Sequence, residues 1–211
     1  MRTIVIASSK GGTGKSTIAA HLAVEAEKAG EGPTAVVDTD SQGSLSAWWN
    51  TREADTPLFA MIDVVNLTAH LEALDAHGVA LTIIDTPPAL TETIHASIAV
   101  ADLVVIPVRP SPHDLRAVAV VIDVVESAKK PFLFVINGAT PRTNIALDAL
   151  RALAQHGRVA PSILHHRIDF AVSMIDGRTV GELNQKSRSA YEVAELWNYV
   201  RAQLRKDARR T

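Results

Sequence analysis

The stretch SSKGGTGKST, residues 8–17, decides the fold, and it directly follows the apolar run RTIVIAS of residues 2–8. A phosphate-binding loop usually has a glycine five places before its Gly-Lys pair, but this chain has Ser9 there and Lys10 next to it. An apolar strand before the loop and a helical pattern after it are the context in which such loops bind phosphate. The stretch therefore predicts a strand–loop–helix unit that cradles a phosphate chain.

Each residue of the loop has a physical role in that prediction. Glycine lets backbone N–H groups approach the phosphates closely, and the helix that begins near Lys15 directs the positive end of its dipole at them. We expect Lys15 to contact the β- and γ-phosphates, Ser16 to bind Mg²⁺, and Thr17 to donate to the α-phosphate. The backbone cradle consists of Gly11, Gly12, Thr13 and Gly14. A glycine-rich turn that binds nothing would explain the glycines but not the Lys-Ser-Thr run in this register.

Composition limits the class of protein. The chain has 211 residues, of which 47% are hydrophobic and 21% charged, as expected for one folded α/β domain over residues 1–211. It has no cysteine, which excludes disulfides, iron–sulfur clusters and thiol catalysis. No apolar run reaches the ~18 residues of a membrane span, so we expect a cytoplasmic protein.

Short apolar runs alternate with helical patterns along the chain. Most of the strand-like runs are continuously apolar, which is typical of strands buried on both faces of a parallel sheet. The alternation predicts an α/β fold, a mostly parallel sheet with helices on both faces. The expected strands are 2–8, 34–39, 58–62, 80–85, 102–108, 132–137 and 162–166. The expected helices are 15–29, 44–52, 66–77, 91–99, 113–128, 143–156 and 188–206.

Two strands end in carboxylates. Asp38 and Asp40 lie in VVDTDSQGS, residues 36–44, and Asp85 lies in LTIIDTPPAL, residues 81–90. Magnesium–nucleotide chemistry needs carboxylates at the ends of neighbouring strands, where ligands bind in open α/β sheets. An Asx turn at a strand end is the alternative, above all for Asp38.

The run KGGTGKST resembles the deviant Walker A box of the ParA/MinD class of ATPases. In that class the first lysine, here Lys10, reaches across a dimer interface to the phosphates of the other subunit's ATP. The resemblance implies an ATP- and Mg²⁺-dependent homodimer in which Lys10 stabilises transferred charge much as an arginine finger does. A solvated loop lysine is the alternative.

The carboxylate motifs resemble the switch segments of the same class. VVDTDSQGS is similar to switch I, D-x-D-P-Q-G, with Ser41 where the proline stands, and DTPP is similar to the opening of switch II. The resemblance implies that Asp40 positions the attacking water, that Asp38 holds a magnesium-bound water, and that Asp85 contacts Mg²⁺ through water. With the loop residues, the implied catalytic set is Lys10, Lys15 and Asp40.

Two later segments, VRPSPHDLRA (108–117) and RIDFAVSMIDGRTVGE (167–182), resemble the small ParF-type partition ATPases. In the family an asparagine near Asn137 reads adenine, and Met174 and Ile175 would line the base pocket. An Asn-Gly turn and simple apolar packing are the respective alternatives.

The C-terminal segment is basic. Residues 178–211 hold 8 basic and 4 acidic side chains, against 13 and 19 in residues 1–177. Val193, Leu196, Trp197, Val200 and Leu204 have the spacing of one helix face. The face can pack on the sheet or lie on a membrane, and the basic cluster can bind DNA phosphates without sequence preference. The basic cluster at the end of this segment consists of Arg201, Arg205, Lys206, Arg209 and Arg210. The expected DNA contacts are Arg201, Arg205 and Lys206 of this cluster, with Lys186 and Arg188 extending the same surface.

The resemblance implies a nucleoid-associated partition or positioning ATPase whose hydrolysis is stimulated by a partner, ParB-like or another small protein. Its cargo would be a plasmid, a chromosome region or a protein complex. A MinD-like ATPase that acts on the membrane surface at the division site is the alternative, and we expect no membrane partner for this chain.

Overall fold

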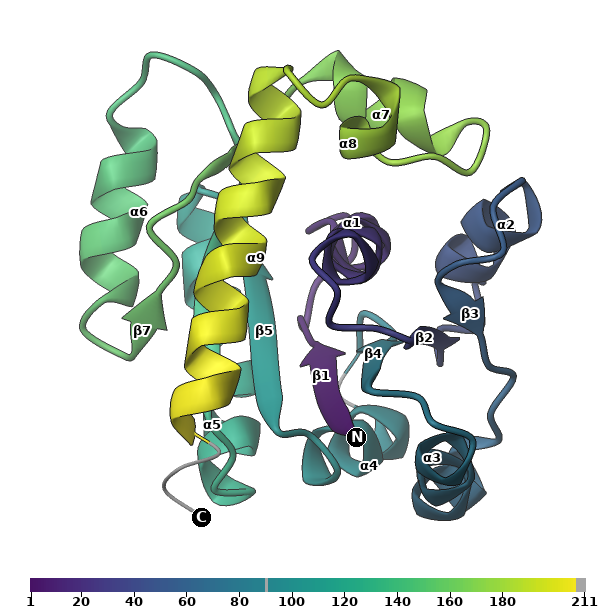
Figure 1. Ribbon diagram of the computed structural model, residues 1–211. Coiled ribbons are helices and arrows are strands. Elements are labelled where there is room, and N and C mark those ends of the chain that lie inside the picture. The colour runs from purple at the N-terminus through teal and green to yellow at the C-terminus, as the bar shows by residue number, and fades with distance from the viewer. Residues whose placement is uncertain (90, 208–211) are drawn as a thin grey trace.

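A central parallel sheet with helices on both sides forms the protein (Figure 1). The computed structural model describes residues 1–89 and 91–207. The order of strands across the sheet is β3-β2-β4-β1-β5-β6-β7, and β8 pairs with β6. The strands pair in parallel, so their carboxyl ends lie along one edge of the sheet. The α/β fold predicted from the alternating pattern is confirmed.

The strands are short and mostly buried. Their bounds are β1 Arg2–Ile6, β2 Thr34–Asp38, β3 Leu58–Phe59, β4 Leu81–Asp85, β5 Leu103–Val108, β6 Phe132–Ala139, β7 Arg158–Val159 and β8 Leu164–His165. Every residue of β4 and β5 is buried, as their continuous apolar sequences predict. In register, Ile6 of β1 lies beside Asp85 of β4, and Asp38 of β2 lies on its other side.

Two groups of helices cover the sheet. One face packs against α1 (Lys15–Lys28), α2 (Ser44–Asn50), α8 (Val180–Leu183) and α9 (Arg188–Asp207). The other face packs against α3 (Leu67–Ala76), α4 (Glu92–Ala99), α5 (Pro112–Ser127) and α6 (Ile145–Leu153). The remaining elements are a 3₁₀ turn at Val64–Asn66 and α7 (Ile168–Met174). Within the described residues, no helix is both long enough and apolar enough to cross a membrane.

Several boundaries differ from the sequence prediction. The strands predicted at 58–62 and 162–166 are only two residues long in the structure, as β3 and β8. The sequence analysis did not predict β7, α7 or α8. The strand predicted to end at Asn137 continues to Ala139. Gly138 has a φ of 67°, which only glycine adopts without strain, and this allows an irregularity in the pairing with β8 between Asn137 and Ala139.

The C-terminal helix α9 packs its apolar face on the sheet side of the protein. Val193, Leu196, Trp197, Val200 and Leu204 are all at most 8% exposed. The helix contacts α1 and α8, and Figure 1 shows it running along the whole height of the sheet. Of the two alternatives for this apolar face, the structure therefore shows packing. Arg209 and Arg210 lie outside the described residues.

Candidate functional site

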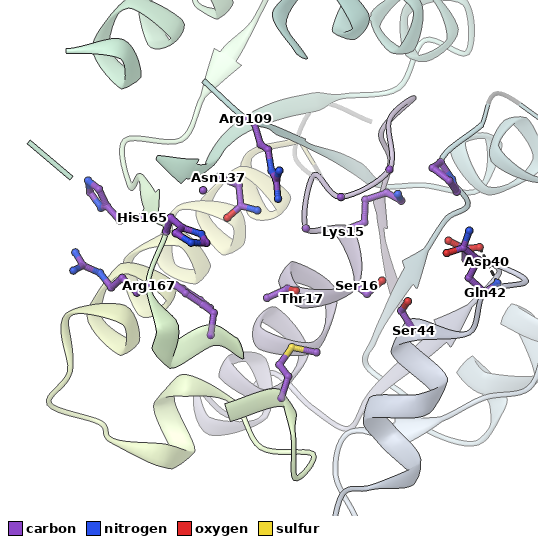
Figure 2. Close-up of a pocket in the computed structure, with 18 residues that line it drawn as sticks. Lys15, Ser16, Thr17, Asp40, Gln42, Ser44, Arg109, Asn137, His165 and Arg167 are labelled. Atoms are coloured by element: carbon purple, nitrogen blue, oxygen red, sulfur yellow. Dashed lines mark hydrogen bonds between the residues drawn. The ribbon is translucent and has the colours of Figure 1, made fainter. Parts of the chain in front are cut away.

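A cavity of about 420 Å³ opens at the carboxyl ends of the strands, over the start of α1 (Figure 2). Its walls come from the loop before α1, the loop after β2, and the ends of β5, β6 and β8. The lining residues are Gly11, Gly12, Gly14, Lys15, Ser16, Thr17, Asp40, Gln42, Ser44, Pro88, Arg109, Asn137, Gly138, His165, His166, Arg167, Phe170 and Met174. Three cationic side chains, Lys15, Arg109 and Arg167, line it against one carboxylate, Asp40, and the start of α1 faces it, which suits a polyanion.

The loop after β1 is shaped by glycine and fastened by Asn137. Gly14 has a φ of 92° at the start of α1, in the left-handed region. The Asn137 side-chain amide donates to the Thr13 carbonyl at 2.6 Å, so it lies directly over the loop. Thr13, a residue of this loop, is buried and does not line the cavity. The side chain predicted to read adenine thus has one donor committed to holding the loop.

Gly14→Ala is expected to deform the loop and destabilise the fold. A Cβ at Gly14 would overlap the Asn137 amide nitrogen, and the φ of 92° would itself be strained for alanine. We expect a loss of about 2 kcal/mol in the free energy of unfolding, measured by urea denaturation. Gly30→Ala is the matched control, because Gly30 has a φ of 72° with no atom within 4 Å of its Cβ position. Equal losses in the two variants would show that the Asn137 contact contributes nothing.

Lys15 is the buried cation of the cavity. It is only 7% exposed, and burial lowers its pKa, while the carboxylates of Asp85 and Asp40 oppose that shift. Figure 2 shows Lys15, Ser16 and Thr17 at the start of α1, on the floor of the cavity. Because this charged amine has little contact with solvent, an anion bound beside it would stabilise the charge strongly.

Asp85 ends β4 with its carboxylate fully buried. Both of its oxygens lack a hydrogen-bond partner within the described part of the chain. Burial raises the pKa of Asp85 to about 7; the nearby Ser16 hydroxyl and Lys15 oppose this, whereas Asp38 and Asp40 add to it. An orphaned carboxylate beside a serine hydroxyl fits a divalent cation. The residues that would hold Mg²⁺ are Ser16 and Asp85, and the ion would neutralise phosphate charge there.

The two aspartates after β2 differ in position. Asp38 accepts hydrogen bonds from the backbone N–H and hydroxyl of Ser46, both at 2.8 Å, and from the Asp40 N–H at 3.1 Å. It does not line the cavity, and its bonds form the Asx turn that was the alternative to a magnesium role. Asp40 does line the cavity, and its carboxylate accepts from the Gln42 N–H (Figure 2).

Lys10 lies outside the cavity that holds Lys15. Its Nζ is 3.5 Å from Asp114 Oδ1, in the first turn of α5, and its side chain is 40% exposed. The neighbouring Ser9 hydroxyl donates to the Ala117 carbonyl at 2.8 Å, which fastens this end of the loop to α5. Lys10 therefore points toward the surface rather than toward its own nucleotide cavity.

The far end of the cavity contains residues that the sequence reading missed. Arg109 directly follows β5, His165 and His166 lie at β8, and Arg167 and Phe170 begin α7. Glu192 of α9 fixes two of them, since its carboxylate contacts His165 Nδ1 at 2.8 Å and Arg167 at 2.7 Å. Burial raises the pKa of Glu192, but the Arg167 and His165 hydrogen bonds outweigh this and hold it below its usual value.

The structure places the two residues predicted to line a base pocket in different environments. Met174 lines the cavity, whereas Ile175 is 75% exposed and outside it. Ile175 follows the last residue of α7, and its side chain projects into solvent instead. The prediction for Ile175 is corrected accordingly.

A buried histidine ties the cavity floor to α8. His21 Nδ1 lies 2.7 Å from the Thr17 carbonyl, and Nε2 accepts from the Val180 N–H at 3.1 Å. Burial lowers the pKa of His21 to about 4, so the ring is neutral at pH 7. The ring also packs against Phe170 in a tilted arrangement, with 5.2 Å between the ring centroids. These contacts fix the position of Phe170 relative to α1, the helix that carries Thr17.

The five predicted DNA contacts do not form one cluster. Arg188 begins α9 and Lys206 lies in its last turn, about 27 Å away along the helix axis. Arg201 and Arg205 both pair with Glu31, at 3.5 and 2.6 Å. Lys186 and Arg188 are exposed at the other end of the helix. The basic residues at the two ends of α9 therefore do not form one continuous face within the described part of the chain.

Comparison with known proteins identifies the family of the chain that forms this cavity. A family model described as the CobQ/CobB/MinD/ParA nucleotide binding domain matches residues 4–180. "Maintenance of carboxysome distribution protein A" from Halothiobacillus neapolitanus is 30% identical over 210 residues, which cover 94% of this chain and 95% of that protein.

Two solved structures share the fold. An ATP complex of McdA from Cyanothece has a TM-score of 0.79 and 20% identity, covering 97% of this chain and 96% of the other. MinD from Pyrococcus horikoshii, complexed with Mg-ADP, has a TM-score of 0.77 and 18% identity, covering 94% and 95%. These relatives support the ParA/MinD class as a whole and not specifically its small ParF-type members, so the narrower likeness stays a prediction. The chain belongs to the CobQ/CobB/MinD/ParA nucleotide-binding family and is a ParA/MinD-type ATPase.

Proposed function

We propose that this chain is a positioning ATPase that dimerises around two ATP–Mg²⁺ units, grips DNA without sequence preference in that state, and releases it on hydrolysis. The observation that supports the proposal is that two lysines of the same loop lie in different places. Lys15 is buried in the cavity, while Lys10, four residues after β1, lies outside it on Asp114. A lysine that served its own nucleotide would be expected beside Lys15.

A second subunit explains the position of Lys10. Its side chain is anchored by one ion pair at 3.5 Å and is 40% exposed, so little holds it in place. The phosphates of a facing subunit carry more negative charge than one carboxylate does, and they would attract it more strongly. ATP would then act as the ligand that selects the dimer, because both active sites are complete only there.

Lys10→Ala tests this step. We expect the variant to bind ADP within about twofold of the wild type but to lose ATP-driven dimerisation and at least ~100-fold in turnover, the loss typical of removing an arginine-finger-like group. Light scattering with ATP or ADP gives the mass, and phosphate release gives the rate. Lys130→Ala, which removes one cation from the turn after α5, is the control. A Lys10→Ala protein that still dimerises and hydrolyses ATP would refute a role in trans.

We propose a protein assembly as the cargo. The support is the carboxysome-distribution relative, which matches this chain over nearly the full length of both proteins. A ParB-like or other small partner would stimulate hydrolysis, and the protein would be cytoplasmic and nucleoid-associated. Lys186 and Arg188 at the start of α9, with Lys206 at its end, are the proposed DNA contacts that no described carboxylate pairs. Dimerisation would double that surface, as phosphate-driven binding requires.

The structure offers less support for the MinD-like alternative. The apolar face of α9 is buried against the rest of the fold, so it is not presented to a lipid surface. Co-sedimentation with duplex DNA and with anionic liposomes, each with ATP and with ADP, separates the two functions. We expect ATP-dependent DNA binding and no lipid binding; ATP-dependent lipid binding alone would favour the alternative.

A further inference from the structure

A second cavity lies at the other end of the sheet from the nucleotide cavity. Its volume is about 340 Å³, within the range of small-molecule sites. It is bounded by the first residues of β1 and β4, by the turn after α1, and by the C-terminal half of α9. Figure 1 shows that half of α9 at the end of the molecule where β1 begins. None of the residues that line it also lines the nucleotide cavity.

The cavity has an apolar floor and a cationic rim. Leu81, Trp197 and Leu204 form the floor and are buried, at most 8% exposed. Arg201 and Arg205, one helical turn apart on α9, stand on the rim with Arg2 opposite them on β1. A mostly apolar lining with a few charged groups at its border is usual for a site that binds an anion with an apolar body.

The charges around the rim are incompletely balanced. Arg201 and Arg205 share the carboxylate of Glu31, and both contact the same oxygen, Oε1. Arg2 pairs with Asp102 at 3.4 Å. Three guanidinium groups therefore face two carboxylates, one of which, Asp102, does not line the cavity. Glu31 itself shows that a carboxylate can occupy the position between the two arginines of α9.

We propose that this cavity binds a small organic anion, a carboxylate or sulfonate joined to a flat apolar body. The anion takes the place of the Glu31 carboxylate between Arg201 and Arg205, and its body lies over Trp197 and Leu204. Duplex DNA fits these two arginines less well, because they border a recess with an apolar floor and already share a carboxylate. The sequence-based assignment of Arg201 and Arg205 to DNA is replaced here by a small-anion site.

Isothermal titration calorimetry with 1-naphthoate as the probe tests the proposal, and 1-naphthalenemethanol serves as its neutral analogue. We expect the acid to bind at least ~10-fold more tightly than the alcohol, because charge-assisted hydrogen bonds to the arginines supply the difference. Saturating ATP–Mg²⁺ should leave the affinity unchanged, since that ligand occupies the other end of the sheet. Equal binding of acid and alcohol, or displacement by ATP, would overturn the proposal.

Two variants locate the site. Glu31→Gln removes the internal competitor and should tighten 1-naphthoate binding by about 5-fold, whereas Arg201→Ala/Arg205→Ala should weaken it by at least ~10-fold. Arg151→Ala on α6 is the control and should bind the acid as the wild type does. If neither site variant changes the affinity, or if the double variant loses only DNA binding, the arginines serve another ligand and the proposal fails. Thermal unfolding of each variant checks that it remains folded.

Discussion

Lys15→Ala is expected to remove nucleotide binding almost completely. Lys15 is 7% exposed in the nucleotide cavity, and its pKa is lowered by burial, so its charge is poorly hydrated and available to an anion. Removing one member of a buried, hydrogen-bonded charge pair typically costs 2–5 kcal/mol or more. The affinity for ATP should therefore fall by roughly 30-fold to several thousand-fold.

Fluorescent ATP-analogue titration measures the loss directly. Lys28→Ala is the matched control, because it removes a lysine from the last turn of the same helix, where Lys28 pairs only with Glu25 at 2.7 Å. That control should bind nucleotide as the wild type does. An unchanged affinity in Lys15→Ala would show that this cavity is not the nucleotide site, whatever the family relationship.

The strand framework was predictable because local sequence determines it. A strand buried on both faces is mostly apolar, and β5 stands out as a continuous apolar run and β4 as one interrupted only by Thr82 before it ends at Asp85. The loop before α1 was predictable for the same reason, since its backbone conformation requires glycine at Gly14. The two-residue strand β7 carries no such signal, because pairing with β6 rather than a sequence pattern creates it.

The far wall of the nucleotide cavity was not predictable from local patterns. Arg109 is distant in sequence from His165 and Phe170, and it meets them because β5 and β8 both pair with β6. One signal was nevertheless available. Arg109 directly follows a buried strand, as polar residues at ligand-binding edges do, and the rule that identified Asp85 would also have identified it.

The roles of charged residues depended on partners that the sequence does not reveal. Asp38 was predicted to hold a magnesium-bound water, yet Ser46 donates two hydrogen bonds to its carboxylate, and Asp38 does not line the cavity. Arg201 and Arg205 looked like a free basic cluster, yet Glu31, about 170 residues earlier, pairs with both. Long-range ion pairs of this kind follow from packing of α9 beside the turn after α1.

Asp85→Asn should stabilise the nucleotide-free protein at alkaline pH while impairing magnesium-dependent hydrolysis. The folded-state pKa of Asp85 is about 7, against an ordinary value of 3.8, because the carboxyl is buried. A carboxyl whose pKa is raised on folding favours the folded state below pH 3.8, and that contribution is lost as the pH rises through 7. The shift corresponds to roughly 4 kcal/mol above pH 7, of which asparagine should recover about 2–3 because its amide is also left without partners.

Urea unfolding of wild type and Asp85→Asn at about pH 5.5 and about pH 8.5 measures this difference. The stability gain should be larger by about 2 kcal/mol at the higher pH. His21 titrates with the opposite sign, since its pKa is lowered to about 4, but it is present in both proteins and cancels from the difference. Asp123→Asn, an exposed change on α5, should show no such dependence.

Mg²⁺–ATP should stabilise the wild type more than Asp85→Asn, because the buried carboxylate then gains its counter-charge. An asparagine variant less stable than wild type at alkaline pH would mean that Asp85 is already compensated within the protein and that its carboxylate does not await a cation.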